Sequence, residues 1–332
     1  MLVDSNVLWM FVLRGEWLLT NQMSSNILNL DTVLSLVKMD ILPKQLKNIV
    51  FGTVSNVFVC GDERYMGRHV NNICGPILLP FRHKYIAVGI VPNGIAVLDL
   101  GMYFDQDSSI YMNRYAITPN NTRRSSKLER LIFGAVFNQP ILPGMLPPNL
   151  TDLTFGRDFN FPIGIDVLPT HLKRLTFGVY FDSDVIFPPE LEYLTFGSRF
   201  NQPIRKLPLT LKHLVFGIQF DQYIVVGMLP TCLLLLTFGN MFNKPISPGV
   251  LPDNLQILIF GNTFNQQLKS LPSCLKQLTF GSDFDQQLVV GLLPFGLEQL
   301  TLGTGFAWPL LAGTFPSTLQ HLIRYRAPFC RI

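Results

Sequence analysis

The five histidines are the first residues to consider for catalysis, because an imidazole can take up and release a proton near neutral pH. His171 lies beside a Leu of a regular apolar pattern, and His213 and His321 occupy equivalent positions of that pattern far apart in the chain. No HExxH motif, EF-hand loop or nucleophile elbow is present. We therefore expect these histidines to be surface residues, and the sequence predicts no enzymatic activity.

Cysteine usage argues against a metal or disulfide framework. The cysteines are odd in number and no two have C-x2-C spacing: Cys60, Cys74, Cys232, Cys274 and Cys330. Gly303-Thr304-Gly305 lacks the third Gly of a dinucleotide loop and the Lys-Ser/Thr of a P-loop. We expect neither a metal nor a cofactor.

Composition indicates a folded chain, with 48% hydrophobic and 14% charged residues. The net charge is +4, but the Lys and Arg residues are scattered, which argues against nucleic-acid binding. The apolar segment Val7 to Leu19 is interrupted by Arg14 and Glu16, so it is too short and too charged to span a membrane. Without a basic leader region, the expected location is intracellular and cytoplasmic.

A glycine that recurs at regular intervals shows that the chain is built from tandem repeats, and these repeats determine where the side chains named above lie. A Gly follows a Leu-x-x-Leu-x-Phe run at intervals of 19 to 22 residues: Gly134, Gly156, Gly178, Gly197, Gly217, Gly239, Gly261, Gly281 and Gly303. The shorter intervals lack residues just before a Leu-Pro pair, as at Arg205-Lys206-Leu207-Pro208. The length variation is therefore predicted to fall in one loop.

Each repeat predicts one short strand. A Pro lies nine residues before the Gly and marks the approach to the strand, as Pro169 does for Gly178. Core positions follow, exemplified by Leu172, Leu175 and Phe177, with Thr or a β-branched residue between the last two. One repeat cannot bury these side chains alone, whereas stacked neighbours can. The predicted fold is a repeat solenoid of leucine-rich-repeat type with short parallel strands, one per coil of about 22 residues.

A Phe followed by Asn or Asp comes after the Gly in eight consecutive repeats. We expect these Phe side chains, Phe137 to Phe284 and then Phe306, to stack as an aromatic spine. The short side-chain carbonyls can accept hydrogen bonds from backbone N–H groups of the turns, forming a ladder that satisfies buried donors. The ladder residues are Asn138, Asn160, Asp182, Asn201, Asp221, Asn243, Asn265 and Asp285. Structural capping is favoured over metal binding because Asn replaces Asp in most repeats.

The unit Leu-x-x-Leu-Thr-Phe-Gly-x-x-Phe-Asn-Gln-Pro-Ile, nearly intact from Leu191 to Ile204, resembles the FNIP repeat, a relative of the leucine-rich repeat. The resemblance covers about residues 126–323. It implies parallel strands on one face of a solenoid and a role in protein recognition. FNIP arrays are known mainly from social amoebae and large DNA viruses, and they often follow an F-box. A viral origin would make the cytoplasm that of the host.

The N-terminal third is predicted to hold weaker repeats over residues 42–125. Leu42-Pro43 to Gly52, Leu79-Pro80 to Gly89 and Val91-Pro92 to Gly101 keep the Pro-to-Gly interval, and residues 105–127 form a polar insertion. Within residues 1–41, Leu30, Val33, Leu34 and Val37 have helical spacing. This segment is either a helical cap over the first coil or an F-box remnant at residues 26–38. Residues 324–332 are expected to be a C-terminal capping tail.

Solvent-facing strand positions are the candidate binding site. They are charged in the earlier repeats and then turn apolar, which is typical of a partner-contact surface. The hypothetical contact residues are Arg174, Tyr193, Val215, Leu234, Leu235, Ile257 and Ile259. The alternative is that a lateral loop or a second copy of the chain covers this patch.

Two functions remain open at this point. The first is a free-standing, non-enzymatic scaffold that presents the strand surface to a protein partner. In the second, the chain recruits substrates to a cullin-type ubiquitin ligase through a truncated F-box, with the F-box adaptor as a further partner. No residue can be nominated for a hydrolase.

Overall fold

The computed structural model describes residues 96–99, 128–309, 311 and 313–325, and the backbone of four further strands near the N-terminus. The chain divides into two compact units, Met1–Gly156 and Arg157–Ile332. The boundary between the units falls within the repeat array predicted for residues 126–323.

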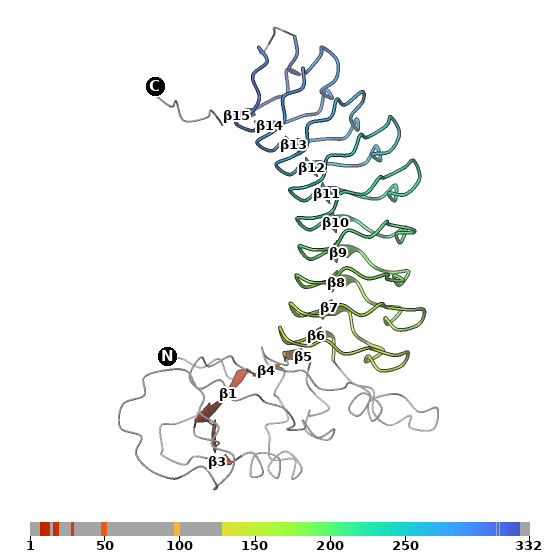
Figure 1. The fold of residues 1–332 in the computed structure, drawn as a ribbon, viewed down its shortest axis with the longest axis vertical. Helices are drawn as coiled ribbons and strands as arrows, with labels where there is room; N and C mark the ends of the chain where they lie inside the picture. The colour runs from red at the N-terminus through yellow and green to blue at the C-terminus, as the bar shows by residue number, and fades with distance from the viewer. Residues whose placement is uncertain are drawn as a thin grey trace, which may run out of the picture. The chain divides into compact units, whose positions relative to one another are not determined.

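The second unit is a ladder of parallel strands, one per coil (Figure 1). Each strand is hydrogen-bonded to the strand of the next coil in sequence order, so the repeats stack as the glycine spacing predicted. The strands are β8 (Arg174–Thr176), β9 (Tyr193–Thr195), β10 (His213–Val215), β11 (Leu235–Thr237), β12 (Ile257–Ile259), β13 (Gln277–Thr279), β14 (Gln299–Leu302) and β15 (His321–Arg324).

The first unit combines parallel and antiparallel pairing. Its sheet has the order β7-β6-β5-β4-β1-β2-β3. The neighbouring strands from β7 to β4 pair in parallel, and so do β4 and β1. The strands are β1 (Val7–Leu13), β2 (Glu16–Leu19), β3 (Leu28–Asn29), β4 (Asn48–Phe51), β5 (Val97–Asp99), β6 (Arg130–Ile132) and β7 (Asp152–Thr154).

The first two strands of the chain form a hairpin. β1 and β2 pair antiparallel with Leu13 opposite Glu16, which leaves a two-residue connection at Arg14-Gly15. The predicted helix over residues 30–38 lies outside the described residues, as does the rest of the F-box segment 26–38 except Leu28–Asn29 in β3. The insertion at 105–127 and tail residues 326–332 also lie outside them.

Strands are described for two of the three expected N-terminal repeats. β4 precedes Gly52 and β5 precedes Gly101, and the two strands pair directly, with Ile49 opposite Leu98. The Leu79-Pro80 repeat lies outside the described residues, so its assignment as a weaker repeat stays a prediction.

Each strand of the array is short because the chain bends just before it. The N–H groups of Leu234 and Leu235 both donate to the carbonyl of Lys212, at N···O distances of 2.8 and 3.0 Å. The equivalent pair in the next coil, Gln256 and Ile257, donates to Leu234 in the same way. The bend turns both residues between the two buried Leu positions outward, which explains the Leu-x-x-Leu spacing.

Glycine ends each strand because the coils touch there through their backbones. A Cβ atom built on Gly239 would overlap the carbonyl oxygen of Gly217, and one on Gly217 would overlap that of Gly197. No side chain fits at this position. The repeat glycine, expected as a turn residue, is therefore required by close approach of neighbouring coils.

Two columns of Phe rings fill the interior of the second unit, where sequence analysis predicted one spine. One column begins at Phe159 and ends at Phe306, with centroids 6.0–6.2 Å apart between coils. The second column consists of the Phe residues just before the repeat glycines, at 5.4–5.8 Å. Within a coil, Phe216 and Phe220 stack at 3.7 Å, and both are buried. The first unit begins the same pattern with Phe133 and Phe137.

The length variation falls in the return loop, as predicted. Every described coil of 22 residues has a residue with positive φ in this loop, such as Gly227 (φ 85°). The shorter coils, which end at Gly197, Gly217 and Gly281, have none. The extra residues therefore form a turn that leaves the strand and both Phe columns unchanged.

Candidate functional site

The outward face of the strands brings equivalent positions of successive coils into direct register. The first strand residues form one row: Arg174, Tyr193, His213, Leu235, Ile257, Gln277, Gln299 and His321. The middle strand residue of each coil from β8 to β14 points inward and is buried. Because the spacing of paired strands is about 4.8 Å, neighbouring side chains in this row can contact one another.

Three members of this row form a continuous stack. The guanidinium carbon of Arg174 lies 4.2 Å from the ring centroid of Tyr193. On its other side, the Tyr193 ring stacks on the imidazole of His213, with centroids 4.6 Å apart and planes inclined by 18°. These contacts hold two aromatic rings and one cation in fixed positions on the sheet.

The residues just before the strands add charge beside this stack. Lys212 Nζ donates to Glu192 Oε2 at 2.8 Å. This hydrogen bond is the main cause that lowers the pKa of the Glu192 carboxyl, and the positive charges of Lys212, Lys173 and Arg174 lower it further. The pKa of His213 is lowered first by burial and then by the charges of Arg174 and Lys212. Both effects favour the neutral form of the imidazole.

The predicted apolar patch is only partly continuous. Leu235 and Ile257 are direct neighbours in register, and Ile259 lies on the same strand as Ile257. Val215 is separated from Ile259 by Thr237 of the strand between them. Leu234 lies outside the strand, in the row that also holds Lys212. All the predicted apolar residues are half-buried, and Arg174 is exposed.

His213 is the site residue that sequence analysis missed. It was expected to be an unremarkable surface residue, whereas it is half-buried and completes the stack between Tyr193 and the apolar residues. The signal was available in the repeat, because His213 and Tyr193 occupy the same position of adjacent coils. His171 is exposed and its Nδ1 lies 3.0 Å from Glu190 Oε1, away from the strands.

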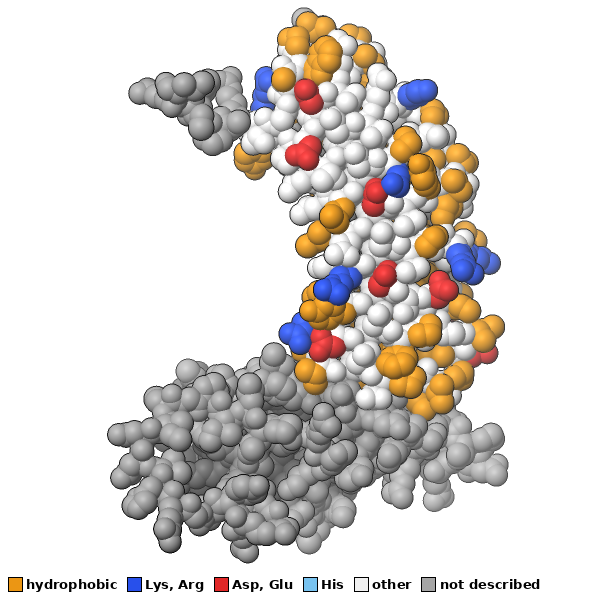
Figure 2. Space-filling view, in the orientation of Figure 1, with side chains coloured by type: hydrophobic (Ala, Val, Ile, Leu, Met, Phe, Trp, Pro, Cys, Tyr) orange, Lys and Arg blue, Asp and Glu red, His pale blue; other side chains and the backbone are white. Residues whose placement is uncertain are grey.

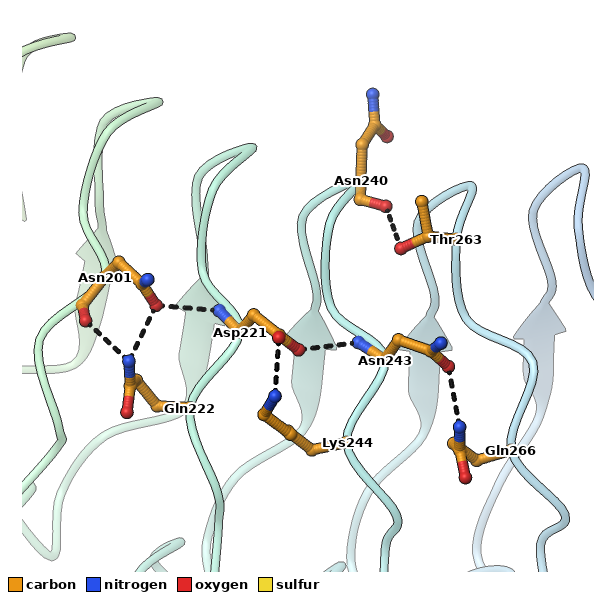
Figure 3. Close-up of polar contacts among 8 residues, drawn as sticks. All are labelled: Asn201, Asp221, Gln222, Asn240, Asn243, Lys244, Thr263 and Gln266. Atoms are coloured by element: carbon orange, nitrogen blue, oxygen red, sulfur yellow. Dashed lines mark hydrogen bonds and ion pairs between the residues drawn. The ribbon is translucent and has the colours of Figure 1, made fainter.

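A polar ladder runs along the turns that follow the strands (Figure 3). Asn201 Oδ1 accepts the N–H of Asp221, whose Oδ1 accepts the N–H of Asn243, each at 2.9 Å. The same contact continues from Asn160 to Asp285 at 2.8–2.9 Å and ends on the N–H of Ala307. Asn138 belongs to the first unit. These residues are half-buried or exposed, so the ladder satisfies donors at the surface, where buried donors had been expected.

The residue after each ladder position forms a second row of contacts that the sequence analysis did not predict. Gln222 Nε2 donates to Asn201 Oδ1 at 3.0 Å, and Gln266 makes the equivalent contact with Asn243. At the acidic ladder residue Asp221, the equivalent contact is an ion pair, with Lys244 Nζ 2.7 Å from Asp221 Oδ2 (Figure 3). These contacts stiffen the array and leave little free hydrogen-bonding capacity at the ladder.

Apolar side chains are also exposed in the return loops, and Figure 2 shows hydrophobic groups along this margin. They include Ile165, Ile186, Val225 and Val226, and Val289 and Val290. Two of the shorter coils, those ending at Gly217 and Gly281, interrupt them with exposed polar residues, Arg205-Lys206 and Lys269-Ser270. The loop margin therefore lacks the residue-to-residue continuity of the strand face.

The described residues contain no group of three or more His, Cys, Asp or Glu side chains that could hold a metal ion. Within the same part of the chain, no helix has the length and apolarity needed to cross a bilayer.

Comparison with protein families agrees with this geometry. The FNIP Repeat model matches residues 137–180, 183–217, 242–283, 264–305 and 284–323. The chain carries FNIP repeats between residues 137 and 323. Its FNIP coils are those whose Gly, Phe and Asn/Asp residues form the inter-coil contacts described above. None of the curated proteins matches the chain.

Among solved structures, the chain is similar to CroV588, described as a novel circular LRR protein. The TM-score is 0.69 with 32% sequence identity, over 86% of this chain and 40% of CroV588. The chain thus spans about two fifths of the length of that relative. YopM from Yersinia enterocolitica WA-314 is more distantly similar, with a TM-score of 0.37 and 19% identity over 71% of this chain and 60% of YopM. The fold is a parallel-strand solenoid of leucine-rich-repeat type.

Proposed function

We propose that the chain is a non-enzymatic scaffold that binds a protein partner through the outward face of β8 to β12. The proposed contact residues are Arg174, Tyr193, Val215, Leu234, Leu235, Ile257 and Ile259, together with His213. The observation that carries this proposal is the register of the face: a stacked cation and two aromatic rings adjoin two neighbouring aliphatic side chains.

The make-up of this face supports protein binding on physical grounds. Arg and Tyr are enriched in the energetically dominant positions of protein interfaces, and aliphatic neighbours exclude water around them. The stack is already formed without a partner, so less conformational entropy is lost when a partner docks. Solenoid repeats place such positions on one extended surface, which suits contact with another macromolecule.

Replacing the two aliphatic side chains tests the proposal. The array itself has Gln at the equivalent positions of β13 and β14, so Leu235→Gln with Ile257→Gln introduces residues that this fold already holds there. The matched control is Val225→Gln with Val226→Gln, which removes two more exposed apolar groups from a return loop.

Affinity capture from cells that produce the protein, followed by quantitative mass spectrometry, provides the measurement. We expect the face variant to lose partners that the wild-type chain and the loop variant both retain, while all three proteins have similar unfolding temperatures. Equal capture by the face variant and the wild type would remove the strand face as the binding site.

A further inference from the structure

The basic half of the strand face has cations without carboxylate partners. Lys173 and Arg174 are both exposed, and within the second unit no ion pair joins either of them to a described carboxylate. In the next coil of that unit, the acidic residue of the face is Glu192, which Lys212 engages at 2.8 Å. Two positive charges are therefore left over on β8 and the residue before it.

The Arg174 guanidinium is also held ready for a ligand. Its central carbon lies over the Tyr193 ring, 4.2 Å from the ring centroid, and that ring stacks on His213. A guanidinium in such a cation–π contact keeps N–H groups available as hydrogen-bond donors. A planar edge with several N–H donors matches the two oxygens of a carboxylate.

The positive potential around Lys173 and Arg174 is also seen in the lowered pKa of the Glu192 carboxyl. After the hydrogen bond from Lys212, the charges of Lys212, Lys173 and Arg174 each lower the pKa of this carboxyl. The same charges favour the ionised form of a carboxylate brought by a ligand.

Leu235 and Ile257, the apolar half of the face, determine how far from the acidic group of a ligand its apolar group must lie. Leu235 and Ile257 are three and four strands from Arg174, which corresponds to roughly 14 and 19 Å at the usual strand spacing. An extended peptide advances by about 3.4 Å per residue and covers these distances in roughly four to six residues. A nucleic-acid backbone would repeat its negative charge over the apolar half, so it matches the face less well.

We propose that the partner presents an extended acidic segment whose Asp or Glu residues lie about four to six residues from an aliphatic or aromatic residue. The acidic group binds Arg174 and Lys173, and the apolar group contacts Leu235 and Ile257. This inference rests on the proposed function, because it assumes that the same face binds a protein.

A displayed library of random linear peptides, selected on the full chain, tests this inference. The decisive variant is Lys173→Glu with Arg174→Glu, and the matched control is Lys206→Glu with Lys269→Glu, which makes the same change in net charge in the return loops. We expect selected peptides to combine Asp or Glu with an apolar residue at the stated spacing. We expect the face variant to bind them at least about tenfold more weakly and the loop variant to change affinity less than about twofold.

The outcomes separate this inference from the proposed function. Selection on the Lys173→Glu, Arg174→Glu variant should enrich peptides with Lys or Arg in place of the acidic residues. Peptides that lose binding with Leu235→Gln and Ile257→Gln but contain no acidic residue would overturn the acidic-segment inference alone. If no selected peptide depends on Leu235 and Ile257, the extended-segment inference is wrong, and the proposed function is wrong as well only if affinity capture is also unchanged by Leu235→Gln with Ile257→Gln.

Discussion

The strand face and the polar ladder run along the same coils, but the residue type changes from coil to coil on the face and stays nearly constant along the ladder. At the first strand position the residue changes from Arg174 to Tyr193, then to Leu235 and Gln277. Along the ladder, from Asn160 to Asp285, every residue is Asn or Asp. A ladder side chain must reach the backbone N–H of the next coil at 2.8–3.0 Å. A face side chain meets only solvent and its lateral neighbours, so inter-coil contact fixes residue type where it occurs and leaves the face free for recognition.

Removing a core ring should give the largest difference in stability between an interior residue and a face residue. Phe220 is fully buried and stacks on Phe216 at 3.7 Å, with Phe200 and Phe242 on either side. Phe220→Ala should lower the free energy of unfolding by roughly 3–5 kcal/mol, because it leaves a cavity. Leu235→Ala on the face should cost less than about 1.5 kcal/mol. Urea unfolding followed by circular dichroism measures both, and equal losses would contradict the distinction.

The next largest effect is expected at the strand-end glycines. Gly239→Ala places a methyl group against the carbonyl oxygen of Gly217, so the coils must separate, at a cost of about 2–3 kcal/mol. Gly227 is the control, because its φ is 85° but nothing lies within 4 Å of an added Cβ. Gly227→Ala should cost only about 1 kcal/mol from backbone strain. Thermal unfolding that ranks the two variants in the reverse order would exclude close approach as the cause.

A smaller loss is expected from the ladder. Asn243 Oδ1 accepts from the N–H of Asn265 and from Gln266, at an exposed position where water can replace it in part. Asn243→Ala should cost about 1 kcal/mol. Asn243→Asp keeps the acceptor and should cost less.

Asn240 provides the negative control for the ladder, because it contributes only its backbone carbonyl to the contact with Thr263 (Figure 3). Asn240→Ala should therefore stay within about 0.5 kcal/mol of the wild type in the same unfolding assay. A ladder variant no worse than Asn240→Ala would show that the ladder does not stabilise the array.

The smallest effect concerns pH and the face stack. Burial lowers the pKa of His213 below its ordinary value of 6.5, so the unfolded chain binds a proton at a higher pH than the folded chain does. The contribution of the neutral His213 side chain to the free energy of unfolding is therefore present above pH 6.5 and is lost as the pH falls below 6.5. His213→Gln should flatten this part of the stability profile. Chemical unfolding at pH 7.5 and 5.5 measures the change, and an identical pH slope in both proteins would refute it.

Sequence alone predicted the periodic part of the fold because each coil repeats the same packing requirement. The phased Gly, Leu and Phe residues were sufficient to predict one short parallel strand per coil, a stacked interior and a variable return loop. The same spacing also predicts the weaker repeat at Leu79-Pro80, which lies outside the described residues.

The face was harder to predict because its contacts lie between coils. The stacking of Tyr193 on His213, and the placement of Thr237 between Val215 and Ile259, depend on which residues of successive strands stand opposite each other. The repeat already places Tyr193 and His213 at the same position of adjacent coils, but the residue types alone do not show that the two rings stack. The second row of Gln contacts was missed for the same reason.

The uniform joints between coils also have an evolutionary consequence. Because every coil meets its neighbours through the same Gly, Phe and Asn or Asp groups, a gene can gain or lose one whole unit by recombination and still encode compatible junctions. Each such event shifts the following face residues by one strand spacing, about 4.8 Å. New arrangements of an old recognition surface can thus arise in a single step, without any change in the interior.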